Sequence, residues 1–426
     1  MKFDFDKVVD RHGTKCLKYD FAKERGRSDD MLPLWVADMD FPTAPGIQKS
    51  LSDAVAHGIY GYSEGKDDYF QAAAGWYEKH FGWKVEKEWL IKTPGVVFAL
   101  AMAVKAYTKE GDAVLLQQPV YYPFSEVITD NHRRLINIFF FKQKTAYEIN
   151  FEEFEQKIVE ENVKLFLMCS PHNPVGRVWK EWELRKIGDI CLKHNVLVVS
   201  DEIHSDFTRE GHPHTVFAKL GAEFEQNCLI CTAPSKTFNL AGLQISNIFV
   251  PNPELRKKLL KEVAAAGYSQ VGLMGLVACQ AAYEEGAEWL AQLKAYLEEN
   301  RKFVKAYLEE QLPEIRLIEP EGTYLLWLDF KALHLNEKEL EHLIVDKAHL
   351  NHLIHVQPGI LAAHEIRHER QPPAVFGHAF MTAGRGIAVP RVALEPFGQL
   401  QKIEQRPRVH GLTCLRARRG CSPRRS

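Results

Sequence analysis

Lys236 is the residue of this sequence whose surroundings best suit covalent chemistry. It lies in the stretch TAPSKTFN at 232–239, between an apolar run at 228–231 and a second one at 245–250. This pattern predicts a turn between two strands, which can hold the lysine partly out of water. Desolvation lowers the pKa of a lysine, and the neutral amine can form a Schiff base. Because a Ser-Lys pair alone is more often an ordinary surface feature, the interpretation depends on the other motifs.

Two polar motifs upstream of the lysine have a similar setting. SPHNPVG at 170–176 and SDEIH at 200–204 each come directly after an apolar run. Helical patterns alternate with these runs, which predicts a parallel sheet with helical crossovers. Ligands bind at the carboxyl ends of the strands in such sheets. Since Asn173, Asp201 and Lys236 all come just after predicted strands, we expect them to share one site.

The order of these motifs resembles that of pyridoxal 5'-phosphate enzymes with the aspartate aminotransferase fold, which is fold type I of these enzymes. WVADMDF at 35–41, YGYS at 60–63 and APSKTFNLAG at 233–242 are similar to stretches of the MalY/PatB-type cystathionine β-lyases, a C-S lyase branch of the class I/II aminotransferase superfamily. The resemblance covers about residues 1–345. It implies an α/β fold, with a large domain built on a mostly parallel sheet flanked by helices and a smaller α+β domain. It also implies pyridoxal 5'-phosphate as cofactor and a homodimer.

The resemblance assigns a role to each site residue. Lys236 is expected to bind the cofactor covalently and then to remove the Cα proton, Asp201 to pair with the pyridine nitrogen, and Asn173 to bond the ring hydroxyl. The implied cofactor-binding residues are Gly95, Val96, Tyr121, Asn173, Asp201, His204, Ser235 and Lys236, together with Tyr62 from the partner subunit, and the implied substrate-binding residues are Ala37, Asp38, Asn173 and Arg385.

Several of these positions also have simpler explanations. Tyr62 and Tyr121 can be packed amphipathic rings. The glycine turn at Gly95 can be a plain helix start, although the free N–H groups of a helix start also suit a phosphate. His204 can pack beneath the cofactor ring or join its hydrogen bonds.

The implied reaction is cleavage of L-cystathionine or a related S-substituted cysteine to a thiol, pyruvate and ammonia. Gln244 occupies the position where aminotransferases often carry a phosphate-binding arginine, which favours the lyase branch. Two alternatives remain. An aminotransferase can use the same lysine, aspartate and asparagine, and a protein that binds the cofactor can serve as a regulator with little catalysis.

Length and composition are those of an ordinary globular protein. The chain has 426 residues and a net charge of −2, which argues against nucleic-acid binding by the whole chain. The sequence contains no apolar run long enough for a bilayer and no signal-peptide pattern at its acidic start. The eight cysteines are scattered without paired metal spacing. We therefore expect a cytoplasmic protein with reduced thiols and no bound metal. The resemblance implies a small amino-acid substrate.

We expect four parts in the chain. They are an N-terminal arm with part of the small domain (1–47), the large cofactor-binding domain (48–285), the small domain (286–400, atypical from 349) and a basic, disordered tail (401–426).

Two regions depart from the family pattern. The run 139–149 resembles a foreign insertion, and we interpret it as replacing a surface connection. Near the C-terminus, Gly384 occupies the place of the family's carboxylate-binding arginine, so we expect Arg385, rather than Arg391, to bind the substrate carboxylate. HEIRH at 364–368 matches a zinc-protease motif, but the nearby prolines leave no room for the long helix that such a site needs.

Overall fold

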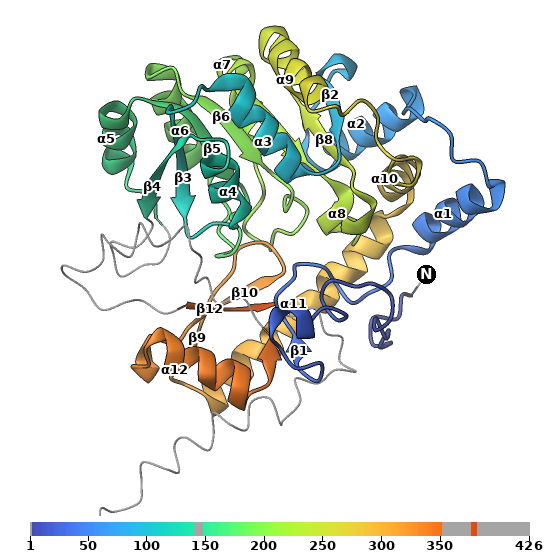
Figure 1. Cartoon of the computed structure of the whole chain (residues 1–426), viewed down its shortest axis with the longest axis vertical. Helices are drawn as coiled ribbons and strands as arrows, with labels where there is room; N and C mark the ends of the chain where they lie inside the picture. Colours follow the sequence, from blue (N-terminus) through green and yellow to red (C-terminus); the bar gives the residue numbers. More distant parts are fainter. Residues whose placement is uncertain (1, 140–147, 352–375, 381–426) are drawn as a thin grey trace, which may run out of the picture.

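The computed structural model describes residues 2–139, 148–351 and 376–380 (Figure 1). Its centre is a seven-stranded sheet with the strand order β2-β8-β7-β6-β5-β3-β4. The strands are β2 (Leu90–Thr93), β3 (Ala113–Gln118), β4 (Arg134–Phe139), β5 (Val163–Cys169), β6 (Leu197–Asp201), β7 (Cys228–Thr232) and β8 (Ser246–Phe249). Strands β3 to β7 pair in parallel, whereas β8 is antiparallel to both β7 and β2. The predicted α/β fold with a mostly parallel sheet is confirmed.

The central strands are apolar because both faces of the sheet are covered. Leu165 and Leu167 belong to the core on one face, and Phe166 and Met168 belong to the core on the other. Alternation of side chains along a strand produces this division. Helices lie on both sides of the sheet (Figure 1). They are α1 (Pro45–His57), α2 (Asp67–Phe81), α3 (Val96–Tyr107), α4 (Pro123–Thr129), α5 (Phe151–Glu161), α6 (Glu181–Lys193), α7 (Ala222–Gln226), α8 (Pro234–Thr237), α9 (Pro253–Ala265) and α10 (Leu273–Glu285).

Local sequence determines where several of these helices begin and end. Asn150 caps α5 by accepting a hydrogen bond from the backbone N–H of Glu153. Phe154 and Ile158, four residues apart on α5, are both buried, so one face of this helix packs against the sheet. The helical stretch that begins with α10 is interrupted at Gly286 and continues as α11 (Ala287–Gln311).

A second, antiparallel sheet follows α11. It consists of β9 (Arg316–Ile318), β10 (Leu325–Asp329) and β12 (Phe376–Phe380), with β10 in the middle. A short helix, α12 (Glu337–Glu341), continues as a π-helical segment, His342–Lys347. A short parallel pair, β1 (Leu32–Pro33) and β11 (Leu350–Asn351), joins the N-terminal arm to this region.

The division of the chain into an arm, a large domain and a small domain, with a boundary near residue 286, remains our proposal. Most of the foreign-looking run at 139–149, the HEIRH motif, Arg385 and the basic tail lie outside the described residues. In the part of the chain that the structure describes, no helix has the length and apolar character needed to cross a bilayer.

Candidate functional site

The predicted site residues lie where parallel strands end. Asp201 is the last residue of β6, and Asn173 follows β5 by four residues. Lys236 lies in α8, directly after β7, so the predicted turn contains a single helical turn. A backbone hydrogen bond links the ends of β5 and β6, because the N–H of Ser170 donates to the carbonyl of Asp201 (2.9 Å). Strands β6 and β7 are parallel neighbours in which Asp201 pairs with Cys231, so Asp201 and Lys236 lie at one edge of the sheet, where their charges influence each other.

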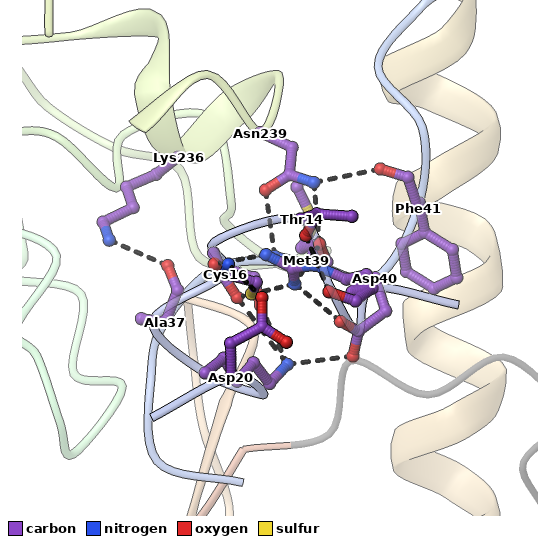
Figure 2. A network of polar contacts seen from close by, with 12 residues as sticks. Thr14, Cys16, Asp20, Ala37, Met39, Asp40, Phe41, Lys236 and Asn239 are labelled. Atoms are coloured by element: carbon purple, nitrogen blue, oxygen red, sulfur yellow. Dashed lines mark hydrogen bonds and ion pairs between the residues drawn. The ribbon is translucent and has the colours of Figure 1, made fainter. Parts of the chain in front are cut away.

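The amine of Lys236 points toward the N-terminal arm. Its Nζ donates a hydrogen bond of 2.8 Å to the carbonyl oxygen of Ala37 (Figure 2). Surrounding protein atoms withdraw the amine from water, which lowers the pKa of Lys236, although the negative charges of Asp38 and Asp201 oppose this change. A lysine with a lowered pKa loses its proton more readily, and the neutral amine is the form that attacks a carbonyl carbon.

Asp201 is a buried carboxyl group, 5% exposed. Burial, assisted by the neighbouring charge of Glu202, raises its pKa to about 7, although a hydrogen bond from the N–H of Ile203 (3.1 Å) and the charge of Lys236 favour the ionised form. A carboxyl group with a pKa near 7 is about half ionised at neutral pH, and a cationic group that approaches it shifts it to the ionised form. Asp201 is therefore suited to a protonated ring nitrogen.

His204, three residues after Asp201, has a buried ring without polar partners among the described residues. Neither of its ring nitrogens has a hydrogen-bond partner among the described residues, although the ring is only 1% exposed. Burial, assisted by the charge of Lys236, lowers the pKa of His204 to about 3. The ring lies edge-on to Tyr324, with 5.8 Å between centroids. Buried polar atoms of this kind normally have partners, so the site has unused hydrogen-bonding capacity for a polar ligand.

Replacement of His204 with phenylalanine should make the stability of the cofactor-free protein less dependent on pH. In the unfolded chain His204 binds a proton near the ordinary histidine pKa of about 6.5, whereas in the folded protein it does so only near pH 3. Between these two pH values the proton favours the unfolded chain, so the stability of the folded protein falls as the pH falls from 6.5 toward 3. Between pH 6 and 4, the free energy of unfolding measured in urea should fall by up to about 1.4 kcal/mol more per pH unit for wild type than for the variant. The same pH dependence of the free energy of unfolding in both proteins would contradict the burial of a neutral His204 ring.

The start of α3 offers a place for a phosphate. Gly95 precedes this helix with φ +156°, a conformation that suits glycine, and no side chain caps the helix. A Cβ atom added to Gly95 would meet nothing within 4 Å, so the space in front of the backbone is open. Val96 begins the helix, and its first N–H groups and dipole favour an anion. Ser235, half-buried in the first turn of α8, can contribute a hydroxyl group.

Tyr121 and Asn173 are tied to each other. The backbone N–H of Tyr121 donates to the carbonyl of Asn173 (3.1 Å). Burial raises the pKa of Tyr121, and the charges of Tyr122 and Asp201 act in the same direction, so its ring lies within reach of the Asp201 charge. Asn173 is 7% exposed, and its backbone N–H donates to Cys169 Sγ (3.3 Å). Both residues therefore belong to the wall of the site.

Tyr62 is placed differently, because its side chain is 98% exposed on the loop after α1. Asp38 lies on the arm, but its carboxylate is paired with Arg11 through hydrogen bonds of 3.0 and 2.8 Å. The arm therefore presents the carbonyl of Ala37, and not a free carboxylate, to Lys236. Arg385 lies outside the described residues.

The sequence analysis missed the residues that hold the arm in place. Asn239 accepts a hydrogen bond from Met39 N–H (3.0 Å) and donates to the carbonyls of Met39 (2.7 Å) and Phe41 (2.9 Å) (Figure 2). Lys18, 1% exposed, and Arg11 both pair with Asp40. Asn239 could have been noticed three residues after Lys236, whereas no local pattern marks Arg11 or Lys18.

Known proteins of one family are similar to this chain over most of its length. The model of the family "Aminotransferase class I and II" matches residues 30–363. The chain is 42% identical to cystathionine β-lyase PatB of Bacillus subtilis, with 81% of this chain and 89% of PatB covered. It is 32% identical to protein MalY of Escherichia coli, with 81% and 88% covered. The crystal structure of cystalysin from Treponema denticola, which contains pyridoxal 5'-phosphate, superposes with a TM-score of 0.86 at 33% identity, covering 95% of this chain and all of cystalysin.

Proposed function

The chain belongs to the class I and II aminotransferase family, within the group that contains PatB and MalY, and from this premise we propose that it is a carbon–sulfur β-lyase. Its substrate is L-cystathionine or a related S-substituted cysteine, and its products are a thiol, pyruvate and ammonia. The observation that carries the proposal is 42% identity to a cystathionine β-lyase over 344 residues.

The cofactor of this chemistry is pyridoxal 5'-phosphate, and three features of the site suit it. Lys236 has an amine with a lowered pKa for covalent attachment. Asp201 is a buried carboxyl group poised to ionise beside a cationic ring nitrogen. The open space at Gly95, before the uncapped start of α3, suits the phosphate. When bound, the cofactor withdraws electrons from the Cα atom of the substrate.

The residues of this chain then have the following roles. Asp201 keeps a proton on the ring nitrogen, and Asn173 donates to the ring oxygen. The N–H groups at Gly95 and Val96 and the hydroxyl of Ser235 would hold the phosphate, while Tyr121 would pack against the ring and His204 would offer it a polar ring nitrogen. We propose these roles on the placement of the residues at one sheet edge.

Lys236 carries the proton transfer. Its neutral amine takes the proton from Cα of the substrate, and the Cβ–S bond breaks with its electron pair leaving on sulfur, which then takes up a proton. The three-carbon remainder reacts with one water molecule to give pyruvate and ammonia. Removal of the amine from water by the arm and the surrounding protein favours this base at neutral pH.

An aminotransferase remains the second candidate, because its chemistry requires the same lysine, aspartate and asparagine. The two functions differ in their need for a second substrate. We expect equal amounts of pyruvate and homocysteine from L-cystathionine in the presence of pyridoxal phosphate and without any 2-oxo acid. Product formation only after addition of a 2-oxo acid would instead establish an aminotransferase. The regulator alternative depended on the C-terminal region, which lies outside the described residues.

We further propose that the protein is a cytoplasmic homodimer. The loop after α1 exposes Ile59 (68%), Tyr60 (60%) and Tyr62 (98%), an apolar group that a second subunit would cover. In such a dimer Tyr62 reaches the cofactor phosphate of the partner. The six cysteines in the described part of the chain are free thiols, and five of them are buried, as expected in a reducing compartment.

Replacement of Tyr62 with phenylalanine should weaken cofactor retention by roughly tenfold, because one hydrogen bond to a charged phosphate is lost. The measurement is the dissociation constant of pyridoxal phosphate from dialysed protein. Tyr60→Phe is a matched control, since Tyr60 lies on the same loop and its hydroxyl donates to the carbonyl of Val55 (3.2 Å). Equal retention by the two variants would refute the role of Tyr62 across the subunit interface.

A further inference from the structure

A turn of the small domain, residues 320–324, is docked tightly against the loop that follows β5. The backbone N–H groups of Glu321 and Gly322 both donate to the carbonyl of Gly176 (2.8 Å each). The carboxylate of Glu321 pairs with Arg177 (2.6 Å). A Cβ atom added at Gly322 would lie 2.9 Å from the carbonyl oxygen of Phe207, so the backbones approach as closely as only glycine allows. The turn therefore has little freedom to shift.

The same turn is fixed to the segment that carries His204. The backbone N–H of Thr323 donates to the carbonyl of Phe207 (2.6 Å). The ring of Tyr324, 4% exposed, lies edge-on to Phe207 at 4.9 Å and to His204 at 5.8 Å between centroids. Tyr324 is thus held by backbone contacts on one side and by two rings on the other.

The hydroxyl of Tyr324 reaches the N-terminal arm. It donates to the carbonyl oxygen of Ala37 at 2.9 Å, and this is the oxygen that accepts from Lys236 Nζ at 2.8 Å. A carbonyl oxygen has two lone pairs, so it can accept both bonds at once. Burial raises the pKa of Tyr324, which keeps its hydroxyl protonated as a donor.

We infer that Tyr324 is a positioning residue: its hydroxyl fixes the Ala37 carbonyl, and this carbonyl holds the amine of Lys236 in a defined place whenever the amine is not covalently engaged. This condition arises before the cofactor is attached and again when an amino-acid substrate replaces the lysine. The inference deepens the proposed function, because it rests on Lys236 as the cofactor-binding residue. It assigns to the small domain a contact that acts on the reactive amine.

The charged and titratable groups around Lys236 determine the expected effect. Asp38 on the arm and Asp201 at the end of β6 favour the ammonium form, whereas the buried surroundings oppose it. His204 and Tyr324 face the same region and remain neutral near pH 7. The Ala37 carbonyl also favours the ammonium form, because it accepts a hydrogen bond from it. Without the Tyr324 hydroxyl the Ala37 carbonyl can turn away from Lys236, and loss of this acceptor, without entry of water, lowers the pKa of Lys236.

The test compares Tyr324→Phe with Tyr107→Phe in the cofactor-free, full-length protein. Tyr107, on α3, also donates from its hydroxyl to a backbone carbonyl, that of Leu255 (2.8 Å), so the control loses the same kind of bond elsewhere. The rate of covalent capture of pyridoxal phosphate is followed by absorbance from pH 6 to 10. For Tyr324→Phe we expect the pH midpoint to fall by about one unit, as loss of a hydrogen bond to a charged group implies, and for Tyr107→Phe we expect the wild-type midpoint.

Equal midpoints for the two variants would overturn the inference. Tyr324→Met also lacks a hydroxyl but fills the space with a flexible side chain, and it must show the same downward shift, so it decides the question if the phenylalanine variant does not fold. Absence of capture by wild type would refute the cofactor assignment itself, and with it this inference. Capture without any lyase products would leave the Tyr324 result valid and refute only the proposed reaction.

Discussion

Replacement of Lys236 with alanine is expected to abolish covalent attachment of pyridoxal phosphate and to lower kcat/KM for L-cystathionine by at least about 1,000-fold. The change removes both the group that binds the cofactor and the base that takes the Cα proton. Positioned general bases alone contribute about 100- to 10,000-fold to a rate. The Ala37 carbonyl loses one of its two donors as well, but Tyr324 remains bonded to it, so the arm should keep its place.

Absorption spectra and steady-state kinetics of the purified variant provide the measurement. The visible absorption of the lysine-bound cofactor should be missing after the variant is mixed with pyridoxal phosphate. Lys257→Ala is the control, because Lys257 is exposed on α9. A variant at position 236 that kept the absorption and the activity would show that another residue binds the cofactor.

The second large effect is expected from Asp201→Asn, which should lower kcat by about 100-fold or more. Asparagine has nearly the same shape and can still accept from the N–H of Ile203, so the local fold should persist. It carries no charge, however, and cannot keep a proton on the ring nitrogen. Each pKa unit by which the carboxylate stabilises that proton corresponds to about 1.4 kcal/mol, and two such units account for the expected loss.

The pH dependence of cofactor affinity gives an independent measurement for the same variant. In the cofactor-free protein the pKa of Asp201 is raised to about 7, so this carboxyl group becomes neutral as the pH falls below 7. Wild type should therefore lose affinity between pH 7.5 and 6 relative to the variant, in which the side chain does not titrate. Asp189→Asn, on the exposed face of α6, should behave like wild type. A constant ratio of affinities between variant and wild type would contradict the pairing.

The site was predictable from sequence where it depends on strand ends. Apolar runs mark β5, β6 and β7, and the polar residues that follow them must meet at one edge of a parallel sheet. Asp201 and Lys236 were identified in this way, and the resemblance to known enzymes supplied their roles. Local patterns were sufficient because each residue is placed by the strand directly before it.

The arm and its contacts were not predictable in the same way. The bonds from Lys236 and Tyr324 to the Ala37 carbonyl join residues separated by 199 and 287 positions. Their acceptor is a backbone oxygen, which every residue has, so no residue type marks the position. Arg11 also resembles an ordinary surface arginine in sequence, and only the folded chain shows that it pairs with Asp38.

The most direct test of the central claim, that one site organised on Lys236 performs the chemistry, is to fix the cofactor in place and find the modified residue. The protein is loaded with pyridoxal phosphate, reduced with borohydride, digested and analysed by mass spectrometry, and its lyase activity is measured before and after reduction. We predict a single modified lysine, Lys236, and loss of activity in proportion to its modification. Modification of a different lysine, or full activity after complete modification of Lys236, would contradict the account.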